Sequence, residues 1–141
     1  MRFMVLVKAS KASEKGELPT TEMLAEMGKF NQELVDAGIM LAGEGLHSSA
    51  NGVRVHFDGN NMSTVENGPF PYTKEMVCGY WIWKLPSMDE AVAWLKRAPF
   101  LDGDEVEIRR IFEAEDFGEQ FTPELREQEA QMAKQMASYS N

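Results

Sequence analysis

Residues able to transfer a proton at neutral pH are scarce in this chain, which has two histidines. His47 follows Glu44 in a glycine-bounded turn after a short apolar segment that predicts a strand. Because the ends of strands often carry functional side chains and histidine titrates near neutral pH, His47 is the candidate general acid or base. The competing interpretation is a partly exposed turn histidine. His56 alternates with apolar neighbours, which predicts a solvated side chain on a hairpin.

Charged and aromatic residues further along the chain could hold a ligand. Lys74 and Glu75 follow a turn-rich segment, and adjacent residues of a strand point to opposite faces, which predicts separate roles for them. Lys74 or Arg109 could bind an anionic group, the alternative for Arg109 being an ion pair with a neighbouring strand carboxylate. Tyr80 has a hydroxyl group that needs a partner, so it is a candidate pocket residue, although aromatic residues of a central strand more often pack in a core or an interface.

Neither a metal site nor a cofactor is expected. The two histidines and the single cysteine, Cys78, lie too far apart to form a recognisable spacing of metal ligands. Gly43 and Gly45 lack the rest of a dinucleotide-binding fingerprint and its parallel-strand context. The lone thiol sits in an apolar run, which is typical of a small buried hydrophobe in a reducing compartment.

The charge balance excludes several classes of partner. The 141 residues carry a net charge of −9, which repels phosphate backbones and anionic membrane surfaces, so we expect no nucleic-acid or membrane partner. The amino-terminal apolar run ends at Lys8 and is too short for a signal segment or a spanning helix. We therefore expect a cytoplasmic protein. Acidic residues crowd the carboxy-terminal part, where a solvated tail is the favoured interpretation over a docking surface.

The elements that must position these residues follow from hydrophobic periodicity and turn signals. Residues 9–19 read as a loop, and the helix after Thr20 and Thr21 places Met23, Met27, Phe30 and Leu34 on one stripe. In the next helix, Ser87 and Glu90 match a capping box. The apolar positions expected to face the core are Met88, Val92 and Leu95, with Ala91 and Trp94 beside them. The predicted elements are strands at 2–7, 39–42, 77–85 and 106–112, a hairpin pairing 53–57 with 62–66, and helices at 21–37, 88–98 and 123–137.

This order predicts an α+β domain of ferredoxin-like topology. Strand, helix, strand, strand, helix, strand is the split β-α-β arrangement, here with an inserted hairpin and an extra carboxy-terminal helix, and it places two helices on one face of an antiparallel sheet. The strands at residues 2–7 and 77–85 are apolar in both phases, so the second face would be an exposed hydrophobic patch. We therefore expect two subunits to pack sheet against sheet as a homodimeric α/β barrel.

The segment from Glu66 to Glu75, Glu-Asn-Gly-Pro-Phe-Pro-Tyr-Thr-Lys-Glu, followed by Gly79-Tyr80-Trp81, resembles the hallmark of the DGPF-motif branch of the YCII-related family. Flanking segments fit in the same order up to about Gly118. The resemblance implies a dimeric ferredoxin-like barrel over residues 1–118, an acidic helical extension over 119–141, and a small-molecule pocket between the sheet and the motif loop. The candidate ligand-binding residues are Glu44, Asn67, Phe70, Lys74, Glu75, Tyr80 and Arg109.

Two departures from that family pattern bear on chemistry. The first residue of the motif is Asn67 in place of aspartate, so it cannot act as an ionised base or a metal ligand. Some YCII-related proteins carry a helix-one histidine thought to form a His-Asp dyad, and Met27 stands at about that position here. The dehydrochlorinase-type chemistry that the resemblance would imply is therefore not expected.

Three functions remain open at the level of sequence. The first is a dimeric domain that binds a small organic ligand without catalysis. The second is a cofactor-free lyase or isomerase with His47 as general acid or base and Lys74 or Arg109 holding an anionic substrate. The third is an accessory role linked to sigma-factor regulation through the acidic terminal helix, because DGPF-type domains are often associated with such factors.

Overall fold

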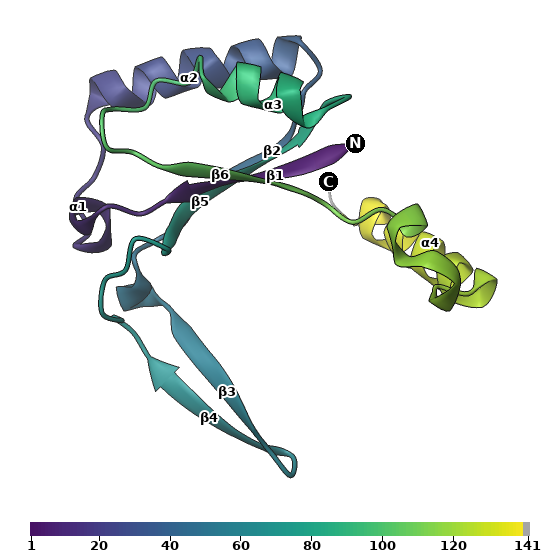
Figure 1. Ribbon diagram of the computed structural model, residues 1–141. Coiled ribbons are helices and arrows are strands. Elements are labelled where there is room, and N and C mark those ends of the chain that lie inside the picture. The colour runs from purple at the N-terminus through teal and green to yellow at the C-terminus, as the bar shows by residue number, and fades with distance from the viewer. Residues whose placement is uncertain (140–141) are drawn as a thin grey trace. The chain divides into compact units, whose positions relative to one another are not determined.

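A computed structural model describes residues 1–139, which divide into two compact units, Met1–Arg110 and a second that begins at Ile111. The first unit contains a four-stranded sheet in the order β2-β5-β1-β6 with every neighbouring pair antiparallel (Figure 1). This order is that of the ferredoxin-like fold, so the predicted α+β class and topology are confirmed. The strands are β1 (Arg2–Lys8), β2 (Met40–Gly45), β5 (Val77–Lys84) and β6 (Val106–Arg110).

Two helices cover one face of this sheet, α2 (Thr21–Asp36) and α3 (Met88–Leu95) (Figure 1). The core lies between them and the sheet, where Trp83 is completely buried and the Phe30 ring meets Trp81 edge-on at 6.0 Å between centroids. The aromatic strand residues are therefore packing residues first. The buried core side chains are Phe3, Val5, Phe30, Leu34, Ile39, Trp81, Trp83, Leu85 and Ala91.

Local signals set the ends of α2 as expected. The hydroxyl group of Thr20 accepts a hydrogen bond from the Met23 amide, which satisfies one of the free amides of the first turn. Gly38 follows the helix with φ of +73°, a conformation that glycine adopts without the steric cost that a Cβ brings. Phe30 and Leu34 then face the core, whereas Met23, at the start of the predicted stripe, is exposed.

Three details of the sequence prediction are wrong. Residues 9–19 are not all loop, because Ser10 and Ser13 cap each other and form a short helix, α1 (Lys11–Glu14). The core face of α3 is centred on Ala91, with Trp94 and Leu95 packed half-buried beside it as expected, whereas Met88 and Val92 lie at its margin and are 39% and 37% exposed because the helix is turned slightly from the expected phase. The last strand ends at Arg110, which leaves Phe112 outside the sheet and exposed.

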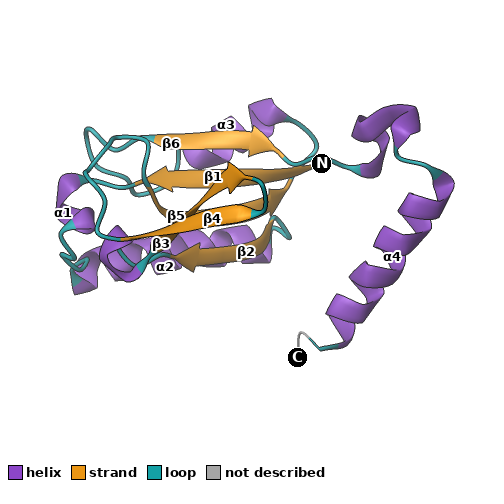
Figure 2. Ribbon diagram, turned by 90° about the horizontal axis from the view of Figure 1, so that it is seen from below, coloured by secondary structure: helices purple, strands orange, loops and turns teal. Residues whose placement is uncertain are grey.

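The second face of the sheet carries no helix in the first unit, and Figure 2 views the strands from this side with α2 and α3 behind them. Alternation along the strands places Met4 opposite Ile82 and Leu6 opposite Tyr80 on this face. All four side chains are half-buried, because they shield only one another. We call this surface, defined by these four residues, the open face.

An inserted hairpin extends from one end of the sheet on the side of the open face (Figures 1 and 2). It follows a short 3-10 turn (Ser49–Asn51) and consists of β3 (Val53–Gly59) and β4 (Met62–Asn67), which pair with each other as a separate two-stranded sheet. The connecting residues Asn60 and Asn61 both have positive φ, as a tight hairpin turn requires. The predicted hairpin is thus confirmed, and every residue of its two strands is exposed.

The second unit is helical. A 3-10 segment (Ala114–Gln120) precedes α4 (Pro123–Ser138), whose first turn is capped by the Thr122 hydroxyl group accepting from the Leu125 amide. The Phe112 and Phe117 rings stack with centroids 4.9 Å apart. Among residues 1–139, none of the helices is both long enough and apolar enough to span a bilayer.

Replacing Gly28 by Ala should stabilise the domain. Gly28 lies in the interior of α2, and a Cβ there would meet no atom within 4 Å, so the change removes backbone freedom from the unfolded chain at no steric cost. We expect the free energy of unfolding to rise by about 0.5–1 kcal/mol in urea denaturation followed by circular dichroism. Gly38→Ala, at positive φ, should lower it by about 1 kcal/mol, and equal effects of the two variants would contradict this assignment.

Candidate ligand site

A hollow of about 250 Å³ lies where β2 and β5 pass beneath α2. Its floor is short of side chains because Gly43 pairs with Trp81 and Gly45 pairs with Gly79, and this register places all three glycines on the same face as Trp81, the face covered by the helices. A Cβ at Gly45 would meet no atom within 4 Å, so the space above this position is empty. Other residues on this face of the strands, such as Trp81, carry side chains that fill the core. The hollow remains because Gly45 has no side chain at the corresponding position.

The walls of the hollow are mostly apolar. Met27 contributes from α2, Val7 from β1, Trp81 from β5, and Phe100 from the segment after α3. The Trp81 and Phe100 rings meet edge-on with centroids 6.1 Å apart, so two aromatic surfaces face the space together. Walls of this kind favour a flat apolar ligand, since apolar and aromatic surfaces line most small-molecule sites.

Three polar residues belong to the lining, Asn31, Glu44 and Tyr80. Glu44 and Tyr80 pair with each other, and their register directs both side chains to the open face, so they border the hollow with their backbone and Asn31 supplies the polar side chain on the helix side. Asn31 lies one helical turn after Met27, and its Oδ1 accepts a hydrogen bond of 2.9 Å from the Trp81 indole Nε1. Accepting that bond fixes the orientation of the amide. Within residues 1–139 no acceptor contacts its Nδ2 group, so that group can donate to a ligand. Glu44 is exposed on the edge strand β2, so a negative charge lies near the hollow although its side chain leaves the other face of the sheet.

Of the residues singled out from the sequence, the structure brings Glu44 and Tyr80 to this hollow and places the others elsewhere. His47 is exposed in the loop after β2, with its Nδ1 3.4 Å from Asn51 Nδ2, and it is not among the lining residues. Arg109 is exposed on β6, where its Nε lies 3.8 Å from Glu107 Oε2. The sequence did not identify Asn31 and Phe100, because an amide on a helix and an aromatic residue in a loop are common, and only their tertiary contacts show that they line a hollow.

The motif loop has a structural role at the root of the hairpin. Ser49, in the turn before β3, connects the motif loop to α1. Its amide and its hydroxyl group both donate to the Glu14 carboxylate, and the same hydroxyl oxygen accepts from the Phe70 amide at 2.9 Å. The Gly68 amide donates to the Gly52 carbonyl oxygen at 2.9 Å. Gly68 comes so close to this turn that an added Cβ would overlap the Ser49 carbonyl group. Only glycine fits there, because the obstacle is backbone rather than a movable side chain.

Phe70 completes this root, which we define as Glu14, Ser49, Arg54, Gly68 and Phe70. The Phe70 ring is buried, and the Arg54 guanidinium lies 3.8 Å from its centroid, within range of a cation–π contact. Asn67 is the last residue of β4 and is exposed. Hydrogen bonds and aromatic packing therefore hold the hairpin at a defined angle, and neither Asn67 nor Phe70 lines the hollow.

Lys8 joins the end of the motif segment to the sheet. Its Nζ lies 3.0 Å from Glu75 Oε2 and 3.3 Å from Glu107 Oε1, and only 8% of its side chain is exposed. The hydrogen bond to Glu75 raises the pKa of Lys8 above its ordinary value of 10.5, with Glu107 adding to the effect. Lys74 and Glu75 lie in a turn before β5, so the expectation that they alternate along a strand is wrong: the ladder begins only at Val77.

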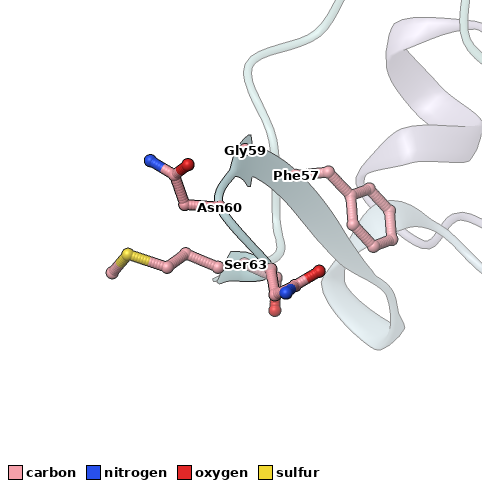
Figure 3. A pocket seen from close by; sticks show the side chains of 6 residues that line it. Phe57, Gly59, Asn60 and Ser63 are labelled. Atoms are coloured by element: carbon pink, nitrogen blue, oxygen red, sulfur yellow. The ribbon is translucent and has the colours of Figure 1, made fainter.

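Two other features are weaker candidates for chemistry. Burial raises the pKa of the half-buried Cys78 thiol, which disfavours the reactive thiolate at neutral pH. A shallow depression at the hairpin tip is formed only by the tip itself, and Figure 3 shows the Phe57 ring and the Asn60 side chain extending away from each other there. The described part of the chain has no group of three or more His, Cys, Asp or Glu residues placed to hold a metal ion.

An antiparallel sheet in this order, with helices on one face and a hollow beneath one of them, defines a small ferredoxin-like α+β domain. A family model described as "YCII-related domain" matches residues 1–115. The chain therefore belongs to the YCII-related domain family, and the family resemblance noted in the sequence is confirmed at this level.

Comparison with solved structures finds a similar chain in 5-chloro-2-hydroxyhydroquinone dehydrochlorinase (TftG) from Burkholderia phenoliruptrix AC1100, in complex with 2,5-dihydroxybenzoquinone. The two share 17% sequence identity with a TM-score of 0.43, over 82% of this chain and 98% of that chain. Similarity of this size transfers neither the ligand nor the reaction. No curated protein matches the sequence.

Replacing Gly68 by Ala should disrupt the root of the hairpin. The added methyl group would overlap the Ser49 carbonyl group, so the loop must move and the hydrogen bonds of Ser49 and Gly52 are strained or lost. We expect the free energy of unfolding to fall by about 2 kcal/mol or more in urea denaturation. Gly52→Ala is the matched control, since Gly52 has φ of −123° and its added Cβ would stay 3.5 Å from the same oxygen. A similar loss in both variants would contradict the steric argument.

The ion pairs of Lys8 should stabilise the fold only while its ammonium group is charged. Because its pKa is raised in the folded state, this contribution is fully present below pH 10.5 and is lost as the pH rises through the higher folded value. Lys8→Met should therefore destabilise the domain at pH 8, and the difference from the unmodified protein should shrink at pH 11 in urea denaturation. Lys29→Met, which removes an exposed pair with Glu26, should have little effect at either pH. A Lys8 effect that is constant with pH would contradict an electrostatic origin.

Proposed function

We propose that this protein is a homodimeric, DGPF-type member of the YCII-related family that binds a small organic molecule in the hollow between α2 and the β2–β5 edge. The observation that carries the proposal is the juxtaposition of empty space above Gly45, two aromatic walls and an oriented amide at Asn31. A pocket that is mostly apolar with a few fixed polar groups is the usual form of a small-molecule site. The hairpin tip and the surroundings of Lys8 have no such combination of empty space, aromatic walls and a fixed polar group, so we do not include them in the site.

The lining also limits the chemistry of the ligand. Trp81 and Phe100 favour an aromatic ring, and the Asn31 amide favours a carbonyl or ether oxygen on that ring as hydrogen-bond acceptor. The negative charge of Glu44 near the hollow disfavours a carboxylate or phosphate. The proposed ligand class is therefore an uncharged monocyclic aromatic carbonyl compound, which differs from the anionic ligand that Lys74 and Arg109 alone would suggest.

The homodimer is part of the proposal because the open face needs a cover. Met4, Leu6, Tyr80 and Ile82 form a continuous apolar strip across the two central strands, which a soluble monomer rarely leaves in water. Packing of two such faces would close the sheets into a dimeric barrel. The residues after Gly118, with the exposed helix α4, are proposed to be an extension outside this assembly.

A lyase or isomerase using His47 is the alternative. His47 lies two residues after Gly45, so a ligand that protrudes from the hollow past Glu44 would pass toward this loop. The two functions are distinguished by following a bound aromatic carbonyl compound by mass spectrometry: turnover that His47→Ala abolishes supports the alternative, whereas binding without conversion supports the proposal.

Filling the hollow should abolish binding in proportion to the volume added. Acetophenone and 4-hydroxyacetophenone serve as probes, with quenching of the tryptophan fluorescence and a rise in the melting temperature as readouts. We expect Gly45→Ala to weaken binding by a fewfold and Gly45→Leu by at least about tenfold, because the larger side chain occupies the space above Gly45.

Gly28→Ala is the control for this series, because it also replaces a glycine beside Met27 but lies outside the hollow. It should leave affinity unchanged. Far-UV circular dichroism checks that the Gly45 variants are folded. Binding of the probes that is equally strong in Gly45→Leu would place their site elsewhere and overturn the proposal.

A further inference from the structure

The hairpin has two chemically different faces. Pairing of Val55 with Val65 and of Phe57 with Ser63 places the apolar side chains of both strands on one side. The other side is polar and internally paired: His56 Nε2 lies 2.9 Å from Glu66 Oε1, and the Thr64 hydroxyl group donates to Asp58 Oδ2 at 2.7 Å. This is the pattern of a strand pair that is covered on one side and solvated on the other.

In the single chain the apolar side of the hairpin is uncovered. The exposed fractions are 60% for Val53, 46% for Val55, 85% for Phe57 and 59% for Val65. We call these four residues the arm face. Scattered exposed apolar residues are ordinary, but four aligned on one side of a two-stranded ribbon form a contiguous patch of the kind that marks an interaction site. An isolated hairpin is also only marginally stable in water, so this one requires a covering surface.

The chain cannot cover the arm face by folding the hairpin back onto its own sheet. The root of the hairpin is held by the hydrogen bonds of Ser49 to Glu14 and Phe70, by the fit of Gly68 against the Ser49 carbonyl group, and by the Arg54–Phe70 contact. These interactions set the angle at which the hairpin leaves the domain, as seen in Figure 1. The rigid root keeps the arm extended, although an uncovered apolar surface, the open face, lies on the same side of the domain.

We propose that the hairpin is a dimerisation arm whose apolar face, Val53, Val55, Phe57 and Val65, packs against the rim of the open face of a second copy of this chain, beside the contact between the two sheets. The inference rests on the homodimer of the proposed function and adds the element that embraces the partner. In a two-fold symmetric pair, each copy supplies one arm and receives one arm, so both apolar surfaces are covered in one interface. The polar side of each arm, with His56 and Glu66, stays in solvent.

The sizes of these surfaces agree with a stable pair. The arm face exposes roughly 400 Å² of apolar area, on the scale of a few large side chains. Each open face exposes less than an arm, because its four side chains are half-buried, so the pair would bury roughly 1,200 Å² in total, at the lower end of the standard size of a specific interface. The open face alone, four half-buried side chains, supplies only part of such an area.

The charges around the two surfaces allow this contact despite the net charge of −9. The arm face carries no charged residue, and the cations Lys8 and Arg109 stand beside the open face, where each is paired with Glu107. Glu107 is thus paired when the arm docks, whereas Glu44, which pairs with Tyr80 on the edge strand, must stay in solvent at the margin of the contact.

A glutamate at position 57 should separate the two copies. Phe57 is the most exposed residue of the arm face, so Phe57→Glu leaves the monomer fold intact but places a charge in each of the two contacts. In sedimentation velocity over a range of protein concentrations, we expect the dimer dissociation constant to rise at least about a hundredfold. Far-UV circular dichroism and the binding of acetophenone report whether each chain is still folded.

Met62→Glu is the matched control, because Met62 is a similarly exposed residue of the same hairpin but lies on its opposite side. This variant should dimerise as the unmodified protein does. A monomeric unmodified protein would refute the homodimer itself. A dimer that withstands Phe57→Glu would refute the arm alone and leave sheet-to-sheet packing in place.

Crosslinking identifies the partner surface directly. Phe57→p-benzoylphenylalanine is irradiated in a mixture of unlabelled and ¹⁵N-labelled protein, and crosslinked peptides are sequenced by mass spectrometry. Peptides that join position 57 to Leu6 or Ile82 with mixed isotope labels would establish contact between different copies. Crosslinks within one copy only, or to residues of α2, would overturn the proposal.

Discussion

Packing of Trp81 against the second helix is the interaction on which the rest of the domain depends. The Trp81 ring meets Phe30 edge-on and donates to Asn31, so one side chain fixes both the position and the rotation of α2 over the sheet. The same placement leaves Gly43, Gly45 and Gly79 beneath the helix without side chains to fill the gap. The core and the hollow are thus two results of one contact: a large aromatic residue holds the layers apart, and glycines beside it leave the space unfilled.

The one-sided helix layer has a second consequence. Two short helices can cover only one face of a four-stranded sheet, and the central strands β1 and β5 carry apolar side chains on both. The domain therefore presents an uncovered sheet face and an uncovered hairpin face, both apolar and both held in place by the rigid root of the hairpin. These two apolar surfaces are the ones that the proposed dimer would remove from water.

The motif segment that suggested the family shapes the backbone at the root of the hairpin. Gly68 lets the loop approach the Ser49 carbonyl group, Phe70 fills the gap below Arg54, and the Asn67 side chain lies exposed at the end of β4. Loss of the motif's carboxylate at position 67 therefore leaves this arrangement intact. The proposed ligand site lies instead between α2 and the β2–β5 edge, and its lining includes Glu44 and Tyr80, which were identified from the sequence.

By itself the sequence determined the class of fold, the four central strands, the two covering helices, the hairpin and the family. These follow from the alternation of apolar residues and from caps such as Thr20 and Gly38, which act over a few neighbouring residues. The phase of α3, the turn at Lys74 and the burial of Lys8 were decided only by tertiary structure, as was the grouping of Asn31 and Phe100 around one hollow. Those features depend on which distant segments meet. The register of β2 on β5 and the packing of α2 on Trp81 determine these contacts between distant segments, and neither can be deduced from the local pattern of residues.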